Sequence, residues 1–179
     1  MTDRTGSDFT AKPKIGISRC LLGDPVRYDG QSKPRTTAVD RLADHFQLIP
    51  ICPEVEAGLP TPRPPVRLTG SIEHPRVTGR DQPGLDITEL MAHYCREKTP
   101  DLNQLSGFIL KSRSPSCGLH STPVFIDDEC VTETSSGVFA RAVQAAYPEL
   151  VLIEETGLEE AGELEGFIAA VLKRAACDG

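Results

Sequence analysis

The chain has 179 residues, of which 39% are hydrophobic and 25% are charged, the balance of a soluble globular protein with one domain of ordinary size. Its formal net charge of −7 and its low aromatic content of 5% argue against a nucleic-acid-binding surface. No stretch reaches the roughly 18 apolar residues of a membrane-spanning helix, so no membrane partner is expected either.

The first residues differ in character from the rest. Residues 1–13 are mostly polar and lack an apolar core, which predicts a disordered N-terminal tail rather than a secretory signal. A single domain is then expected over residues 14–176. Without an export signal the expected location is cytoplasmic, where thiols stay reduced. The six cysteines therefore favour ligands, catalysts or buried residues over disulfide partners.

Apolar runs alternate with amphipathic stretches along this domain. The runs are short and continuous, which is typical of strands buried on both faces of a parallel sheet: residues 14–18, 47–51, 107–110 and 150–153. Four other stretches have apolar residues at helical spacing, starting near Val39, Ile87, Phe139 and Leu158. The alternation predicts an α/β fold. We expect a small doubly wound parallel sheet of about four strands with helices on both faces, of the Rossmann or flavodoxin kind.

Two connections are too long for simple turns. Residues 53–85 hold seven prolines, which predicts irregular structure over most of that length. Residues 111–136 are predicted to form a loop followed by an irregular hairpin around residues 123–131. Connections of this length in compact domains are either functional or surface decoration.

Three cysteines follow predicted strands. Cys20 comes two residues after the first apolar run, Cys52 directly follows the second, and Cys117 lies in the loop after the third. The carboxyl ends of parallel strands share one edge of a sheet, and ligands bind at that edge. We therefore expect these three thiols to converge in space.

Three thiolates without a fourth suit two metal systems. One is a catalytic zinc ion with three protein ligands and a water, an option that His120 near Cys117 keeps open. The other is a [4Fe-4S] cluster with one open iron, and the third possibility is unrelated thiols. The spacing alone leaves all three open. Cys95, Cys130 and Cys177 are interpreted as structural or surface residues.

The sequence around each of the three cysteines resembles a known family. The segments CLLGDPVRYDG (20–30), CPEVEAGLPTPRPPVRL (52–68) and GFILKSRSPSCG (107–118) resemble the signature blocks of the TudS-type thiouracil desulfidases. GVFARAV (137–143) is also similar to that family's pattern. The resemblance extends from residue 14 to about residue 150.

The resemblance implies a cofactor, a reaction and catalytic residues. It implies a [4Fe-4S] cluster held by Cys20, Cys52 and Cys117, whose open iron captures the sulfur of a thiolated nucleobase. Water then replaces that sulfur, giving uracil and sulfide. The catalytic residues implied are Glu54 and Ser114. The chemistry is reasonable in itself, because soft sulfur suits thiolate-bound iron and a carboxylate near the site can activate water.

Three more residues are expected to contact the substrate: Asp29, Arg67 and Ser116, which could also take the serine role. The stiff segment 53–83 is expected to wall the pocket. The alternatives are a non-catalytic iron–sulfur or thiol sensor and a zinc-dependent nucleobase hydrolase. The deaminase signature of His-x-Glu with Pro-Cys-x-x-Cys is absent, which counts against the latter. The expected partner is thus a small thiolated nucleobase, and the sequence indicates no oligomeric state.

Overall fold

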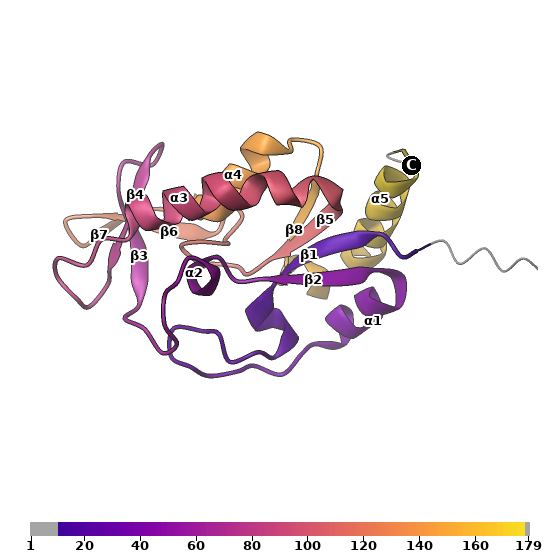
Figure 1. The fold of residues 1–179 in the computed structure, drawn as a ribbon, viewed down its shortest axis with the longest axis horizontal. Coiled ribbons are helices and arrows are strands. Elements are labelled where there is room, and N and C mark those ends of the chain that lie inside the picture. Colours follow the sequence, from indigo (N-terminus) through magenta and orange to yellow (C-terminus); the bar gives the residue numbers. More distant parts are fainter. Residues whose placement is uncertain (1–10, 178–179) are drawn as a thin grey trace, which may run out of the picture.

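The computed structural model describes residues 11–177. Most of the predicted N-terminal tail, residues 1–10, lies outside them. The described chain contains two four-stranded sheets, called sheet A and sheet B, with helices packed against them (Figure 1). Within the described part, no helix is long and apolar enough to cross a bilayer.

Sheet A consists of the four apolar runs that were predicted as strands. Its strands are β1 (Lys14–Ser18), β2 (Gln47–Ile51), β5 (Leu105–Leu110) and β8 (Val151–Glu154). They lie in the order β2-β1-β5-β8, and every neighbouring pair is parallel. All six residues of β5 are buried, which explains why its sequence is apolar without alternation.

Helices cover both faces of sheet A (Figure 1). One face packs against α1 (Thr37–His45) and α5 (Glu163–Cys177), and the other packs against α3 (Thr88–Lys98) and α4 (Val138–Ala146). Ile15 and Ile109 point to the first pair, whereas Phe108 and Leu110 point to the second. The four predicted helices are therefore present, and a mixed α/β fold with a parallel four-stranded sheet is confirmed. The more specific doubly wound description stays a prediction.

The last helix begins later than its sequence pattern suggested. It was expected from about Leu158, but that residue lies in a separate 3-10 turn, Gly157–Glu159. Gly162 follows with a φ of 86°, in the left-handed region that a helix cannot include. α5 therefore starts only at Glu163.

Sheet B was not anticipated as a sheet. Its strands are β3 (Val66–Gly70), β4 (Pro75–Gly79), β6 (Thr122–Ile126) and β7 (Glu129–Ser135). The order is β4-β3-β6-β7, with β3 and β6 parallel and the outer pairs antiparallel. The irregular hairpin expected around residues 123–131 is β6–β7, and its pairing contains two register shifts.

The proline-rich segment 53–85 is more regular than expected. It contains α2 (Pro53–Glu56) as well as β3 and β4. Pro75 is the first residue of β4, an edge strand, and no proline lies inside β3. The prolines thus occupy positions where a missing backbone N–H does not interrupt a ladder.

Candidate active site

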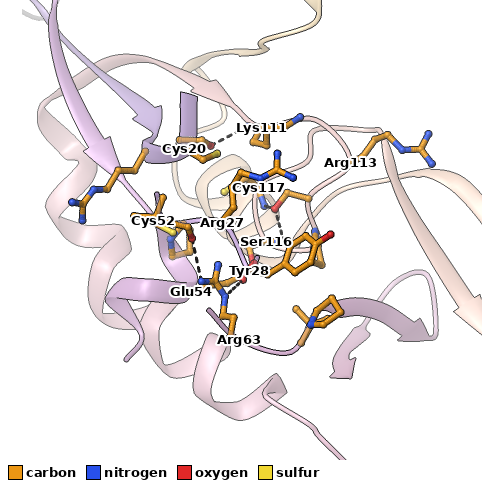
Figure 2. A pocket seen from close by; sticks show the side chains of 18 of the residues that line it. Cys20, Arg27, Tyr28, Cys52, Glu54, Arg63, Lys111, Arg113, Ser116 and Cys117 are labelled. Carbon is orange, nitrogen blue, oxygen red and sulfur yellow. Dashed lines mark hydrogen bonds and ion pairs between the residues drawn. The ribbon is translucent and has the colours of Figure 1, made fainter. Parts of the chain in front are cut away.

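The carboxyl edge of sheet A borders a cavity of about 320 Å³. Cys20 lies in a 3-10 turn that directly follows β1, Cys52 lies between β2 and α2, and Cys117 lies in the loop after β5. All three side chains line the cavity, as Figure 2 shows. The structure thus brings together the three residues expected as ligands, and their role as ligands stays a prediction.

Burial dominates the electrostatics of these thiols. Loss of solvent raises the pKa of Cys20 to about 11 and also raises the pKa of Cys52. Cys117 is only 6% exposed, and burial raises its pKa well above the ordinary value. The charges of Cys20 and Cys52 raise the pKa of Cys117 further, because the three groups are close. A metal centre that binds these thiols must therefore displace their protons.

Glu54 is a buried carboxylate in the wall of the same cavity. It follows Pro53, whose fixed φ suits the first position of α2, and it is 9% exposed. Its Oε2 accepts a hydrogen bond from Arg63 Nε at 2.7 Å, and its Oε1 accepts one from Ser116 Oγ at 2.8 Å (Figure 2). Arg63 is held in turn by the carbonyl of Val26 at 3.1 Å. These partners compensate the loss of solvent that a buried carboxylate suffers.

A second carboxylate of α2 fixes the position of Cys52. Glu56 Oε1 accepts a hydrogen bond from the backbone N–H of Cys52 at 3.0 Å. Its Oε2 accepts one from the Tyr94 hydroxyl at 2.9 Å and lies 3.2 Å from Lys98 Nζ, both on α3. Glu56 therefore ties the turn around Cys52 to a helix in the core.

Ser114 organises the turn that carries Cys117. Its Oγ accepts hydrogen bonds from the backbone N–H of Ser116 at 3.2 Å and of Cys117 at 3.0 Å. Its carbonyl accepts from Gly118 N at 2.9 Å and from Thr122 Oγ1 at 3.0 Å. Because the Ser114 oxygen already accepts two amides, its own hydroxyl proton is available as a donor.

The first turn of α4 supports the Cys117 turn from the other side. Backbone N–H groups of Gly137, Val138 and Phe139 donate to the carbonyls of Gly118, Pro115 and Ser116 at 2.8, 3.0 and 2.9 Å. The first amides of a helix have no partner within the helix. Here the loop carbonyls supply those partners, which couples the loop position to α4.

Cationic side chains outnumber carboxylates in the lining of the cavity, although the whole chain is acidic. Among residues 11–177, six cations and one carboxylate, Glu54, line it; the cations are Arg19, Arg27, Arg63, Arg80, Lys111 and Arg113. Arg113 has a φ of 59°, an uncommon left-handed conformation for a residue other than glycine. Five of the six cations form ion pairs with carboxylates, so much of their charge is compensated within the protein; the pairs are Arg19–Asp24, Arg27–Asp29, Arg63–Glu54, Arg80–Asp81 and Lys111–Glu155.

Two residues expected to contact the substrate do not line the cavity. Asp29 accepts the backbone N–H of Gln31 at 3.0 Å, and this bond is the main reason that the pKa of Asp29 is lowered. Arg67 lies on β3, pairs with Asp128 and stacks over Phe125, with 5.0 Å between its Cζ and the ring centroid. Their contact with substrate stays a prediction.

Two lining residues were missed by sequence reasoning. Within the part of the chain that the structure describes, Tyr28 contributes the only aromatic ring of the lining, and Arg80 packs on that ring with its Cζ 6.0 Å from the centroid. Tyr28 belongs to the CLLGDPVRYDG segment and could have been selected on that ground. Arg80 follows β4, and no local sequence signal indicates that it reaches the cavity.

The other three cysteines lie away from the cavity. Cys95 is buried between α3 and α4, whereas Cys130 and Cys177 are exposed, and none of the three lines the cavity. Within residues 11–177, no three His, Cys, Asp or Glu side chains are grouped as ligands of one metal ion.

Comparison with known proteins connects this geometry to a family. The family profile described as 2-thiouracil desulfurase matches residues 15–155. A solved structure described as the [4Fe-4S]-dependent thiouracil desulfidase TudS superposes with a TM-score of 0.71 at 31% identity, covering 88% of this chain and 99% of that one. An uncharacterised protein, YbbK of Bacillus subtilis (strain 168), is 32% identical over 110 residues, which are 58% of this chain and 72% of YbbK. Since the family profile spans most of the chain and all three cavity cysteines, this protein belongs to the 2-thiouracil desulfurase family.

Proposed function

We propose that this protein is a [4Fe-4S]-dependent desulfidase that converts a thiolated nucleobase and water into the oxo base and hydrogen sulfide. The observation that carries the proposal is the meeting of Cys20, Cys52 and Cys117 around one cavity, after three different strands. The family membership and the similarity to a [4Fe-4S]-dependent desulfidase support it.

The residues of the cavity fit an iron–sulfur cluster. All three cysteines line one cavity of about 320 Å³, and cysteine thiolates are the usual ligands of such clusters. Three thiolates on such a cluster leave it negatively charged, and the cationic side chains of the lining would supply hydrogen-bond donors near that charge. When bound, the cluster would supply a soft Lewis acid for the thiocarbonyl sulfur through the iron that no cysteine holds.

Glu54 is assigned as the general base. It lines the cavity, and its two oxygens are oriented by Arg63 and Ser116. A carboxylate held in this way can take a proton from a water molecule as the water attacks the thiocarbonyl carbon. Ser116 orients Glu54 through its hydrogen bond. We therefore assign Ser116 as a positioning residue and not as one that contacts the substrate.

Ser114 is assigned as the proton donor beside the reacting group. Its oxygen accepts two backbone amides, so its hydroxyl proton is directed elsewhere. Since Ser114 also lines the cavity, that proton can be donated to a heteroatom of the substrate. The hydroxyl would thereby stabilise negative charge that develops on the ring during attack.

Tyr28 is proposed to support the flat face of the base. It is the aromatic residue that the described chain contributes to the cavity lining, and it is 38% exposed, so its ring is accessible. Its backbone carbonyl accepts from Arg63 N at 2.8 Å, which fixes the residue near Glu54. Stacking of a base on an aromatic ring contributes about 1–3 kcal/mol to binding.

Anaerobic reconstitution with iron and sulfide, followed by assays with 2-thiouracil and 4-thiouracil, tests the function. We expect a brown protein that releases stoichiometric uracil and sulfide, measured by chromatography and by a colorimetric sulfide assay. A brown protein without turnover would instead indicate a sensor or binding module. Turnover by colourless, zinc-loaded protein would indicate a zinc hydrolase. Zinc-loaded and metal-free protein are the matched controls.

A further inference from the structure

The loop that carries Cys117 has little regular structure of its own. It runs from Lys111, directly after β5, to Ser121, directly before β6, and it contains Ser114 and Ser116 as well. Two of its residues, Arg113 and His120, have φ values of 59° and 61°. Left-handed backbone at residues other than glycine persists only where the surroundings impose it.

Two consecutive carboxylates at the end of β8 hold both ends of this loop. Glu155 holds the first end: its Oε2 accepts from Ser112 N at 2.6 Å and its Oε1 from Ser112 Oγ at 2.9 Å, and it pairs with Lys111 Nζ. Glu154 holds the second end: its Oε1 accepts from Leu119 N at 2.6 Å and from Ser121 Oγ. Cys117 thus lies between two anchored points.

The two ends are also connected to each other through Glu154. Ser121 Oγ donates to Glu154 and accepts the backbone N–H of Arg113 at 2.7 Å. This chain of bonds closes the loop across its base. Hydrogen bonds to an ionised carboxylate are stronger than neutral ones, so these contacts can impose the observed backbone conformation.

The position of the carboxylates follows from the sheet. Glu154 is in register with Leu110, the last residue of β5, and Glu155 N donates to the carbonyl of Leu110 at 3.1 Å. Successive side chains of an extended segment point in opposite directions, so neighbouring residues reach opposite ends of the same loop. Both glutamates are partly buried, and the Glu155 side chain is 15% exposed.

We propose that Glu154 and Glu155 are positioning residues that preorganise the Cys117 loop for cluster binding. They act before any metal arrives, because all their contacts are within the protein. Glu155 additionally holds the ammonium of Lys111, a cavity-lining cation, in a fixed place. The role of the two glutamates in cluster binding rests on the proposed function, whereas their role in fixing the loop does not.

Thiol labelling of the metal-free chain tests the loop directly. Under anaerobic conditions, a pulse of an alkylating reagent is followed by mass spectrometry at Cys117 and at Cys95. We expect Glu154→Ala and Glu155→Ala to accelerate labelling of Cys117 by about tenfold or more, because loss of the anchors allows local opening. Cys95, which is 7% exposed in the core, should keep its slow rate. Labelling of Cys117 at the wild-type rate in both alanine variants would overturn the proposal.

Conservative variants separate positioning from general destabilisation. Glu154→Gln and Glu155→Gln retain an oxygen that can accept a backbone N–H, so we expect intermediate labelling rates confined to Cys117. If an alanine variant unfolds, which equally fast labelling of Cys95 would reveal, the glutamine variants decide, and unchanged Cys117 labelling in them overturns the proposal. Glu160→Gln is the matched control, since the Glu160 side chain is exposed and makes no hydrogen bond or ion pair within residues 11–177.

Iron retention then tests the consequence for the cluster. We expect reconstituted Glu154→Ala and Glu155→Ala to lose iron to a chelator about tenfold faster than wild type, and the glutamine variants to be intermediate. Wild-type iron loss despite fast Cys117 labelling would overturn the cluster part alone. If the labelling results hold but the wild-type protein does not desulfurate thiouracil, the proposed function fails and the loop-positioning role stands.

Discussion

At the residue scale, Glu54 is distinguished from the other acidic residues by its surroundings. Among residues 11–177 it is the one carboxylate that lines the cavity, beside six cations, and both of its oxygens have a hydrogen-bond donor. Those partners keep the carboxylate in one orientation without blocking the cavity. A surface glutamate with the same sequence neighbours would have no such orientation, so position in the fold makes this residue a candidate base.

Replacing Glu54 with glutamine should abolish turnover and leave the metal centre intact. The amide has nearly the same shape but cannot accept a proton from water, and loss of a general base costs about 10²–10⁴ in rate. The measurements are kcat with thiouracil and iron content per chain. Glu89→Gln, at an exposed position on α3, is the control. Full turnover in Glu54→Gln would assign the base to another group.

The cysteines should divide into two groups of three. Each change to serine at a cavity position should eliminate the broad visible absorption of the reconstituted protein, because serine is a poor ligand for iron in such clusters. The same change at a cysteine outside the cavity should leave the spectrum intact. The cavity group is Cys20, Cys52 and Cys117, and the other group is Cys95, Cys130 and Cys177. Loss of absorption in Cys95→Ser equal to that in Cys20→Ser would contradict the ligand assignment.

At the scale of elements, the first turn of α4 determines where the Cys117 loop can lie. Its first amides bind three loop carbonyls, and Gly137 permits this close approach. A Cβ atom at Gly137 would lie 2.5 Å from the carbonyl carbon and oxygen of Ser116. The helix is therefore a support for the site as well as part of the core.

Gly137→Ala should disturb the site through this contact. We expect it to lower the free energy of unfolding by about 1–3 kcal/mol, the usual effect of overpacking. It should also reduce iron content. Gly166→Ala is the matched control, because nothing lies within 4 Å of a Cβ at that exposed position of α5, and alanine there should stabilise by roughly 0.5–1 kcal/mol. Chemical denaturation measures the free energy of unfolding of both variants. Equal stability of the two would contradict the packing argument.

The junction of sheet B with α3 gives a pH-dependent prediction. Hydrogen bonds from the hydroxyl and backbone N–H of Thr88, followed by Arg76, lower the pKa of Asp86 to about 2. Thr88 Oγ1 accepts Val77 N at 2.9 Å, so the same turn also fixes β4. Because the folded-state pKa is depressed, this contribution is present above the unfolded-state pKa and is lost as pH falls through about 2.

Asp86→Asn should therefore destabilise the metal-free protein at neutral pH by about 1 kcal/mol, because the uncharged amide accepts weaker hydrogen bonds from Thr88 and loses the ion pair with Arg76. The difference from wild type should shrink as pH falls below about 4 and be largely lost as pH falls through about 2, where wild-type Asp86 becomes protonated. Urea denaturation at several pH values measures it. Asp44→Asn, an exposed position on α1, is the control. A difference that persists unchanged at pH 2 would show that the carboxylate charge is not its cause.

At the scale of the whole molecule, sheet A was predictable from sequence and sheet B was not. Strands such as β1 and β5 are continuous apolar runs, a local signal that needs no knowledge of the fold. β3 is short, is preceded by Pro64 and Pro65, and pairs with β6, more than fifty residues away. Its structure depends on that distant partner, and a local pattern carries no information about it.

The candidate site, like the fold, could be predicted from sequence only in part. The convergence of the cysteines could be predicted from sequence, because each follows a parallel strand and the carboxyl ends of parallel strands share one edge of the sheet. The contacts of Glu54 with Ser116, and of Glu155 with Ser112, join residues 62 and 43 positions apart. They depend on side-chain positions in the finished fold. The sequence therefore predicts where the site lies better than it predicts how the side chains within it are oriented.

A cluster bound at the proposed site would also affect the stability of the whole molecule. Cys20, Cys52 and Cys117 follow β1, β2 and β5, the three adjacent strands on one side of sheet A. A cluster bound to all three would link the carboxyl ends of these strands, and a group that binds only the folded state stabilises it by mass action. The hairpin β6–β7 belongs to sheet B and contains none of the three proposed ligands.

Removing the iron anaerobically should therefore destabilise the molecule unevenly. We expect a lower Tm, together with faster hydrogen exchange at the carboxyl ends of β1, β2 and β5 and in residues 111–121. Exchange in β6–β7 should change little, because opening is local to the elements that lose a link. A variant with serine at all three cavity cysteines serves as the control, since its Tm and its exchange pattern should be the same before and after iron treatment. A uniform rise in exchange over both sheets of the wild-type protein would show that the metal centre does not act as a link within sheet A.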